Sequence, residues 1–297
     1  MTLKKSNHEH FSCQAGFRRK RCNSSNLSVP IKNDKSSLWN KYRRMPLSLV
    51  TPAIVLRAQP YGESDRIVSF LTEKHGKITG IAKGAKRSRK RFVNSLEPFS
   101  LVDLRFQDRP HSNLVFIVAA DLLLGFNNLI SSLERIAFAS YMVEITDGLI
   151  GDRDDNALVF HHLKSGLSFL AEQGTSLLFL TSFELKLLRL TGYQPVLVGC
   201  KSCGKERESG LTVQWHFNPT EGGILCDRCC RSTRDGLPVG AAALAALADL
   251  HKGEMLSGAT MPSSVLGEIR RVLLRFIQFQ IGRELKSAPF LVKFCAL

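Results

Sequence analysis

The chain has 297 residues, of which 44% are hydrophobic and 23% are charged, a composition typical of a globular protein with about two domains. No segment approaches the ~18 uninterrupted apolar residues of a membrane-spanning helix, so we expect no membrane insertion. The formal net charge is +15, to which residues 1–46 contribute +9 and residues 47–125 contribute +5. A polyanion is therefore the expected partner of the N-terminal half.

Residues 1–46 are basic, rich in Ser and Asn, and without apolar periodicity. Such a composition buries too little apolar surface to offset the entropy lost on ordering, so we predict a disordered tail. The alternative is a misassigned start, with translation beginning at Met45. The first thirty residues lack the continuous apolar region of a secretory signal, which predicts a cytoplasmic protein with reduced cysteines.

Residues 47–125 carry short apolar segments separated by turn residues such as Glu97-Pro98. In one segment Val102, Leu104 and Phe106 alternate with charged residues, which is the period-2 pattern of a half-buried strand. The expected strands are Ile54–Leu56, Ile67–Leu71, Ile78–Ala82, Leu101–Phe106 and Leu114–Val118. Five strands in this length predict a small barrel such as an OB-fold, although a small open sheet fits the pattern nearly as well.

A cluster of basic residues follows the third expected strand. Its six cations are Lys83, Lys86, Arg87, Arg89, Lys90 and Arg91. In a barrel they would lie on one loop and could follow a phosphate backbone, because phosphate contacts dominate nucleic-acid affinity. Tyr61, Phe92 and Phe99 are near enough to stack on bases, although single aromatic residues more often belong to the core. The alternative interpretation is a solvated, flexible loop.

Residues 126–297 change to helical periodicity. Apolar residues recur at helical spacing from Ala137 to Leu149, from Val159 to Leu167 and from Leu180 to Leu190. Gly174 is expected to separate the second of these helices from the third. Two further helices are expected at Pro238–Lys252 and Ser263–Lys286; in the latter, Ile269, Leu273 and Phe276 should face inward.

Two CxxC pairs interrupt the helical region. Cys200 and Cys203 form the first pair, and Cys226 and Cys229 follow after twenty-two intervening residues. Each pair supplies two thiolates from a tight turn, and two pairs complete the closed tetrahedral shell of a structural Zn²⁺ ion. The alternatives are a redox dithiol, or Cys230 in place of Cys229 as a ligand.

The chain has no motif that indicates catalysis. It contains no GxxxxGK[ST], GxGxxG or GxSxG pattern. Glu63 and Asp65 flank Ser64 just after a turn expected at Pro60-Tyr61-Gly62, and we interpret them as part of a capped turn rather than as an acid/base pair. His161-His162 has no carboxylate at metal-ligand spacing. We therefore predict a protein that is not an enzyme.

Three separate segments resemble the RecO family of bacterial recombination and repair proteins. The first segment is residues 53–92, AIVLRAQPYGESDRIVSFLTEKHGKITGIAKGAKRSRKRF, which is similar to the family's N-terminal barrel. It contains the family's GESD turn, T-x-x-H-G hairpin and A-K-G-A basic loop. The helix leading into the family's zinc module is similar to residues 183–195, FELKLLRLTGYQP, and its C-terminal signature to residues 282–291, GRELKSAPFL. The resemblance extends from Met45 to the C-terminus.

This resemblance implies an α+β protein with an OB-fold at residues 47–125 and a helical domain at residues 126–297 that carries a zinc module at 196–235. It implies binding to single- and double-stranded DNA, annealing of complementary strands and, with the partner RecR, loading of recombinase onto strands coated by single-strand-binding protein. Such a protein would be nucleoid-associated. The DNA-binding role falls on the six clustered cations and on Arg66.

In the family, the helical domain also meets the acidic, apolar tail of single-strand-binding protein, and Arg271 and Arg275 are the candidate cations for that contact. Two other functions fit the motifs. One is an RNA- or ribosome-associated OB-fold and zinc protein. The other is a zinc enzyme acting on nucleic acid, which would need an open coordination position at the metal.

Overall fold

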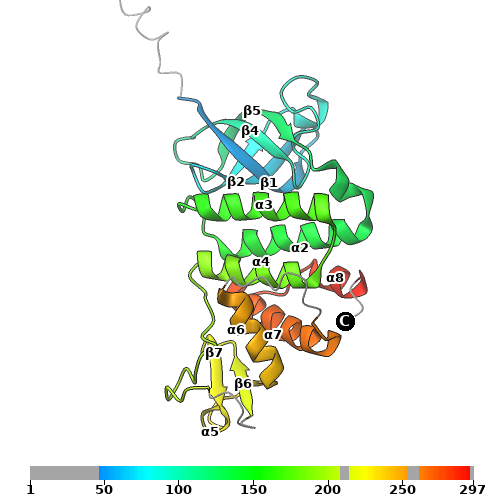
Figure 1. Cartoon of the computed structure of the whole chain (residues 1–297). Helices are drawn as coiled ribbons and strands as arrows, with labels where there is room; N and C mark the ends of the chain where they lie inside the picture. The colour runs from blue at the N-terminus through cyan, green and yellow to red at the C-terminus, as the bar shows by residue number, and fades with distance from the viewer. Residues whose placement is uncertain (1–46, 208–213, 253–260, 295–297) are drawn as a thin grey trace, which may run out of the picture. The chain divides into compact units, whose positions relative to one another are not determined.

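The computed structural model describes residues 47–207, 214–252 and 261–294, and the predictions made for residues 1–46 lie outside these ranges. Five strands come first, and helices and a small three-stranded sheet follow (Figure 1). The protein is thus an α+β protein with an N-terminal barrel, as predicted. Within the described ranges, no helix combines the length and apolarity needed to cross a membrane.

The N-terminal strands close into a barrel in the order β1-β2-β3-β5-β4. Their bounds are β1 Leu49–Tyr61, β2 Asp65–Thr72, β3 Lys77–Ala82, β4 Leu101–Gln107 and β5 Val115–Leu124. Neighbouring strands are antiparallel except β3 and β5, which are parallel. Because β1 pairs with both β2 and β4, the sheet closes on itself. The barrel prediction is confirmed and the open sheet is not formed.

The turn after β1 lies later than the sequence indicated. Pro60 and Tyr61 were expected in the turn, but they pair with Arg66 and Asp65 and belong to the strands. Gly62, at a φ of 56°, makes the reversal instead, because a backbone at positive φ is accessible to glycine at little cost. The first strand therefore reaches the edge of the basic cluster.

Strand β1 is buried on both faces. Ala53 and Val55 lie in the barrel interior, whereas Ile54 and Leu56 belong to the core formed with the helices. This follows from the alternation of side chains along a strand, which sends consecutive residues to opposite faces. The barrel interior also contains Phe92, which is only 6% exposed, so Phe92 is a core residue, the alternative given above, and cannot stack on bases.

The helices pack in layers below the barrel (Figure 1). The short η2 Asn127–Ser131 is followed by α2 Leu133–Leu149, α3 Ala157–Gln173, α4 Leu177–Leu190, α6 Ala241–Lys252, α7 Ser263–Ile281 and α8 Ala288–Phe294. The inward residues expected on α7 are buried, and Gly174 ends α3 at a φ of 87°. Helical periodicity in the sequence thus located α2, α3, α4 and α7, whereas η2 and α8 were not predicted.

Two helix boundaries differ from the sequence prediction. The last long helix stops at Ile281 rather than Lys286, because Gly282 adopts a left-handed φ of 75° and its N–H caps Gln278. The helix expected to begin at Pro238 begins at Ala241, because Pro238 belongs to the short strand β8 Leu237–Val239 and pairs with His216. Pairing with a neighbouring strand is a long-range contact that local pattern does not reveal.

The cysteine region forms a small sheet of its own. Strands β6 Trp215–Asn218 and β7 Gly223–Cys226 are antiparallel, β8 pairs with the other side of β6, and the one-turn helix α5 Asp227–Cys230 follows β7. Trp215, Phe217, Ile224 and Leu225 are buried in the same core as α4, α6 and α7. The module is therefore packed onto the helical domain.

The barrel is joined to the helices by polar contacts as well as by β1. The ammonium of Lys77, at the start of β3, donates to the carbonyl of Asp147 at 2.8 Å and lies 3.4 Å from its carboxylate. The N–H of Arg153 donates to the carbonyl of Lys77 at 2.9 Å. A Cβ on Gly76 would lie 2.0 Å from the Asp154 carbonyl oxygen, so this hairpin requires glycine for close approach.

Candidate functional site

The structure brings the four predicted cysteines together. The sulfur atoms of Cys200, Cys203, Cys226 and Cys229 all lie within 4.8 Å of one another. The Cys203 and Cys226 sulfurs are 3.8 Å apart, which is about the separation expected in a tetrahedral shell with Zn–S bonds of ~2.3 Å. The donor set and its spacing therefore fit a tetrathiolate metal site.

Backbone hydrogen bonds hold the two halves of this cluster in place. The N–H of Lys201 donates to the carbonyl of Ile224 at 2.8 Å, which ties the first CxxC turn to strand β7. The N–H of Gly204 donates to the carbonyl of Cys200 at 2.9 Å, and Gly204 closes the turn at a φ of 73°. The second pair straddles the junction of β7 and α5, with Cys226 at the end of the strand and Cys229 in the helix.

The electrostatics of the cluster favour a cation at its centre. Burial raises the pKa of Cys200, but donation from the N–H groups of Cys203, Cys226 and Ser202 outweighs burial and lowers it to about 6. Hydrogen bonding with Cys203 and Cys226 raises the pKa of Cys229 to about 12. Four thiolates this close need a cation to remain ionised together, because like charges at this distance repel strongly.

Cys230 does not replace Cys229 in the described structure. Its sulfur is not part of the four-cysteine group and lies instead against Gly236. A Cβ added to Gly236 would be only 2.3 Å from the Cys230 sulfur. In the short helix α5, consecutive side chains diverge by roughly 100°, so only one of two adjacent cysteines can face the cluster. Sequence alone left this choice open.

The six clustered cations lie on the loop between β3 and β4, which we call the basic loop (residues 83–91). The loop contains the one-turn helix η1 Ala85–Arg87, and all six cations are exposed. Four of them, Lys83, Arg87, Arg89 and Lys90, form no side-chain hydrogen bond or ion pair with the described part of the chain. These four are therefore available to a polyanion.

The other two cations of the basic loop are engaged with the loop itself. The ammonium of Lys86 donates to the carbonyl of Gly62 at 2.8 Å. The guanidinium of Arg91 donates to the carbonyl of Lys83 at 2.7 Å and lies 5.0 Å from the centre of the Phe92 ring. Arg66, on β2, is paired with Glu97 at 2.8 Å. Spacing alone could not separate these bound cations from the free ones.

Of the three aromatic residues near the basic loop, Tyr61 is the accessible one. Its side chain is 53% exposed at the end of β1, beside the turn that meets the loop. Phe99 is half-buried against the helical core. Of these three aromatic residues, Tyr61 is thus the most exposed to solvent.

Arg271 and Arg275 are exposed residues of α7. They therefore belong to the helical region, whereas the basic loop belongs to the barrel. Arg271 is 3.9 Å from Glu268. A pocket of about 250 Å³ adjoins it between α7 and α8. The pocket is lined by Gly267, Arg270, Arg271, Leu274, Ala288, Leu291 and Val292. Apolar walls with arginines beside them suit an apolar side chain next to a carboxylate.

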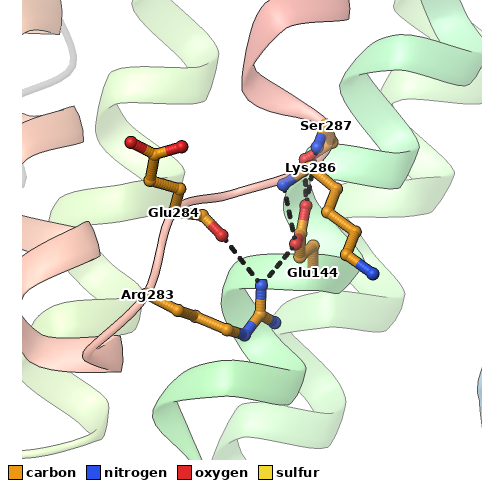
Figure 2. Close-up of polar contacts among 5 residues, drawn as sticks. All are labelled: Glu144, Arg283, Glu284, Lys286 and Ser287. Atoms are coloured by element: carbon orange, nitrogen blue, oxygen red, sulfur yellow. Dashed lines mark hydrogen bonds and ion pairs between the residues drawn. The ribbon is translucent and has the colours of Figure 1, made fainter.

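Glu144 is an anchoring residue that sequence reasoning missed. Figure 2 shows its carboxylate enclosed by the segment that precedes α8, whereas the carboxylate of Glu284 points away. It accepts from Arg283 at 2.7 Å, from the N–H groups of Lys286 and Ser287 at 3.0 and 2.8 Å, and from the Ser287 hydroxyl at 2.6 Å. These partners all belong to the C-terminal signature, and two of the four bonds come from its backbone N–H groups.

The chain matches two family descriptions that together span most of its length. Residues 45–126 match the family described as Recombination protein O N terminal, and residues 130–289 match Recombination protein O C terminal. The chain belongs to the RecO family. The basic loop lies in the N-terminal match and the four-cysteine cluster in the C-terminal one.

Relatives named DNA repair protein RecO are similar over nearly their whole length. The relative from Anaeromyxobacter sp. (strain Fw109-5) is 37% identical over 241 residues, which cover 80% of this chain and 93% of the relative. The relative from Syntrophus aciditrophicus (strain SB) is 33% identical over 252 residues, covering 81% and 94%. The relative from Caldanaerobacter subterraneus subsp. tengcongensis is 29% identical over 249 residues, covering 82% and 98%.

Proposed function

We propose that this RecO-family chain is a DNA repair and recombination mediator that acts without catalytic turnover. It binds single- and double-stranded DNA, anneals complementary strands and, with RecR, helps load recombinase onto strands coated by single-strand-binding protein. The observation that carries the proposal is the row of unpaired cations on one loop of a closed barrel, in a chain whose relatives are named DNA repair proteins. Action on chromosomal DNA would place it at the nucleoid.

The basic loop is the part of this proposal that can be tested first. Replacing Arg87, Arg89 and Lys90 with Glu should weaken binding of a single-stranded oligonucleotide at least about tenfold and lower its salt slope by about 2, since each neutralised phosphate contributes about 0.7. Fluorescence anisotropy at several salt concentrations, together with a strand-annealing assay, measures both. The matched control is Lys164→Glu/Lys186→Glu/Arg189→Glu, which changes charge equally on α3 and α4.

Equal affinity of the loop variant and the control variant would refute the assignment of the basic loop. Preference of the wild-type protein for structured RNA over single-stranded DNA would instead favour the RNA- or ribosome-associated alternative. Phosphate contacts are common to both partners, so only a direct competition between the two polymers separates them.

We propose that Zn²⁺ occupies the four-cysteine cluster and braces the module against the helical domain. Support comes from the four convergent thiols, whose spacing suits a tetrahedral ion. When bound, the ion would supply structural stabilisation, because a shell of four protein ligands leaves no position for water or substrate. A zinc enzyme would need such a position, so this donor set does not support that alternative.

We also propose that the α7–α8 pocket receives the acidic, apolar tail of single-strand-binding protein. The pocket pairs apolar walls with Arg271, and Arg275 lies one turn further along α7. An Arg271→Glu/Arg275→Glu variant should bind a synthetic acidic peptide with an apolar C-terminal residue at least about tenfold more weakly, because each cation that meets a carboxylate would now repel it. Calorimetric titration measures this, with Lys186→Glu/Arg189→Glu as the control; equal affinities would move the contact elsewhere.

A further inference from the structure

The basic loop is fastened to the turn between β1 and β2 by a set of hydrogen bonds. The carboxylate of Asp65 accepts from the N–H of Gly84 at 2.8 Å and from the hydroxyl of Ser64 at 2.9 Å. Gly84 is the residue that turns the chain into the loop, at a φ of 67°. Asp65 therefore holds the point at which the loop leaves the barrel.

Lys86 fastens the same two segments a second time. Its N–H donates to the carbonyl of Ser64 at 2.9 Å, and its ammonium donates to the carbonyl of Gly62 at 2.8 Å. Gly84 and Lys86 of the loop are thus bonded to three residues of the turn. The GESD segment, residues 62–65, therefore supplies the hydrogen-bond partners that hold the first part of the basic loop.

The far end of the loop is held as well. The N–H of Ala120 on β5 donates to the carbonyl of Arg91 at 3.0 Å, and the Arg91 guanidinium returns to the carbonyl of Lys83. Three of the four free cations, Arg87, Arg89 and Lys90, therefore lie between two fixed points, and Lys83 directly precedes the first of them. Of these two points, only the Asp65 bond depends on a side-chain acceptor that can be removed without touching a cation.

An acidic residue among cations would ordinarily oppose the binding of a polyanion. Hydrogen bonds from the Gly84 N–H and the Ser64 hydroxyl lower the pKa of Asp65. The nearby charges of Lys83 and Lys86 lower this pKa as well, but by less. On charge alone, removing Asp65 should tighten DNA binding. If the hydrogen bonds matter more, removing Asp65 should release the loop. DNA binding would then be weaker, because the loop would lose conformational entropy when it became ordered on the strand.

We infer that Asp65 is a positioning residue for nucleic-acid binding: its carboxylate latches the basic loop to the β1–β2 turn so that the free cations are ordered before a strand binds. This inference rests on the proposed function of the basic loop and goes beyond it, because Asp65 itself contacts no phosphate. Preorganisation raises affinity by lowering the conformational entropy lost on binding.

Two substitutions of Asp65 separate charge from hydrogen bonding. Asp65→Asn removes the charge but keeps an oxygen that can accept from Gly84 and Ser64. Asp65→Leu removes the same charge and the acceptor together, at similar size. We expect the Asn variant to bind a single-stranded oligonucleotide within about threefold of wild type, and the Leu variant to bind about tenfold more weakly, with a smaller salt slope.

Hydrogen exchange of the Gly84 amide supplies a readout that does not depend on DNA. It should be faster in the Leu variant than in the Asn variant, while amides of β2 and β3 keep their protection. Asp65→Ala tests the same contact if the Leu side chain perturbs the turn. The role of Asp65 would be overturned if the Leu or Ala variant bound the oligonucleotide as tightly as the Asn variant, or more tightly. The proposed function of the basic loop would survive that result as long as the Arg87/Arg89/Lys90 variant still bound weakly. A normal Arg87/Arg89/Lys90 variant would instead remove the proposed function on which it rests.

Discussion

At the scale of single residues, two carboxylates, Glu144 and Glu184, link helices to other segments through hydrogen bonds. Glu144 accepts four hydrogen bonds from the segment that begins α8 (Figure 2). Glu184 is fully buried and accepts from the Tyr141 hydroxyl and from the guanidinium of Arg270. Burial raises the pKa of Tyr141 well above its usual value, so Tyr141 stays a donor. A buried charge of this kind requires its partner, because an unpaired one is costly.

Glu144 carries a prediction about stability and pH. Burial raises its pKa, but the hydrogen bonds from Arg283, Ser287 and Lys286 outweigh burial and lower it from 4.5 to about 2. The folded state therefore favours the ionised form, and this contribution is complete above pH 4.5 and lost as the pH falls toward 2. Glu144→Gln should lower the free energy of unfolding by about 1–3 kcal/mol at neutral pH.

Chemical denaturation of both proteins at several pH values measures that difference. Glu284→Gln is the matched control, because the Glu284 carboxylate has no hydrogen bond or ion pair within the described residues and should change stability by less than about 0.5 kcal/mol. The stability gap between wild type and Glu144→Gln should narrow as the solution is acidified. A gap that is independent of pH would mean that the ionised carboxylate is not what stabilises this contact.

At the scale of elements, the cysteine module combines very short strands with a cluster of four thiols. Strands β6, β7 and β8 are three or four residues long, and such short strands cannot form a stable unit alone. Their buried side chains belong to the same core as those of α4, α6 and α7, and the four cysteine sulfurs converge within the module. We therefore expect the ion to stabilise the module locally.

Removal of the metal gives the prediction at this scale. Chelation, or Cys203→Ser, should abolish bound zinc measured by elemental analysis and lower the midpoint of thermal unfolding by several degrees, because binding free energy contributes directly to folding. Cys230→Ser is the matched control and should retain zinc, since Cys230 is outside the cluster. Loss of metal from Cys230→Ser with retention in Cys229→Ser would reverse the ligand assignment.

At the scale of the whole molecule, β1 joins the barrel to the helices because it contributes side chains to two hydrophobic cores. Consecutive residues of β1 alternate between the barrel interior and the helical core, and Lys77 adds a polar tie to Asp147. The four-cysteine module lies on the side of the helical layers that faces away from the barrel (Figure 1). The basic loop and the four-cysteine cluster therefore lie on different parts of the molecule.

Much of this arrangement could be predicted from sequence because it depends on local pattern. The strand alternation at Val102 to Phe106 and the helical spacing of α4 predicted these elements, and the two CxxC pairs predicted the cluster. Barrel closure, the β8 pairing of Pro238 and the end of α7 at Gly282 were not decided by local pattern. Each of them depends on partners distant in the sequence or on a single backbone conformation.

Three motifs in the sequence indicated the family by resemblance. Local composition and residue spacing predicted the barrel followed by helices, the four thiols and the position of the basic loop. The three-dimensional contacts were needed to show which cations of that loop are free and that Cys229, not Cys230, lies in the cluster. They alone assigned Asp65 and Glu144 as anchors. The physical reason is that a hydrogen bond or a coordination shell depends on the distance and direction between groups that the fold brings together, and residue spacing carries neither.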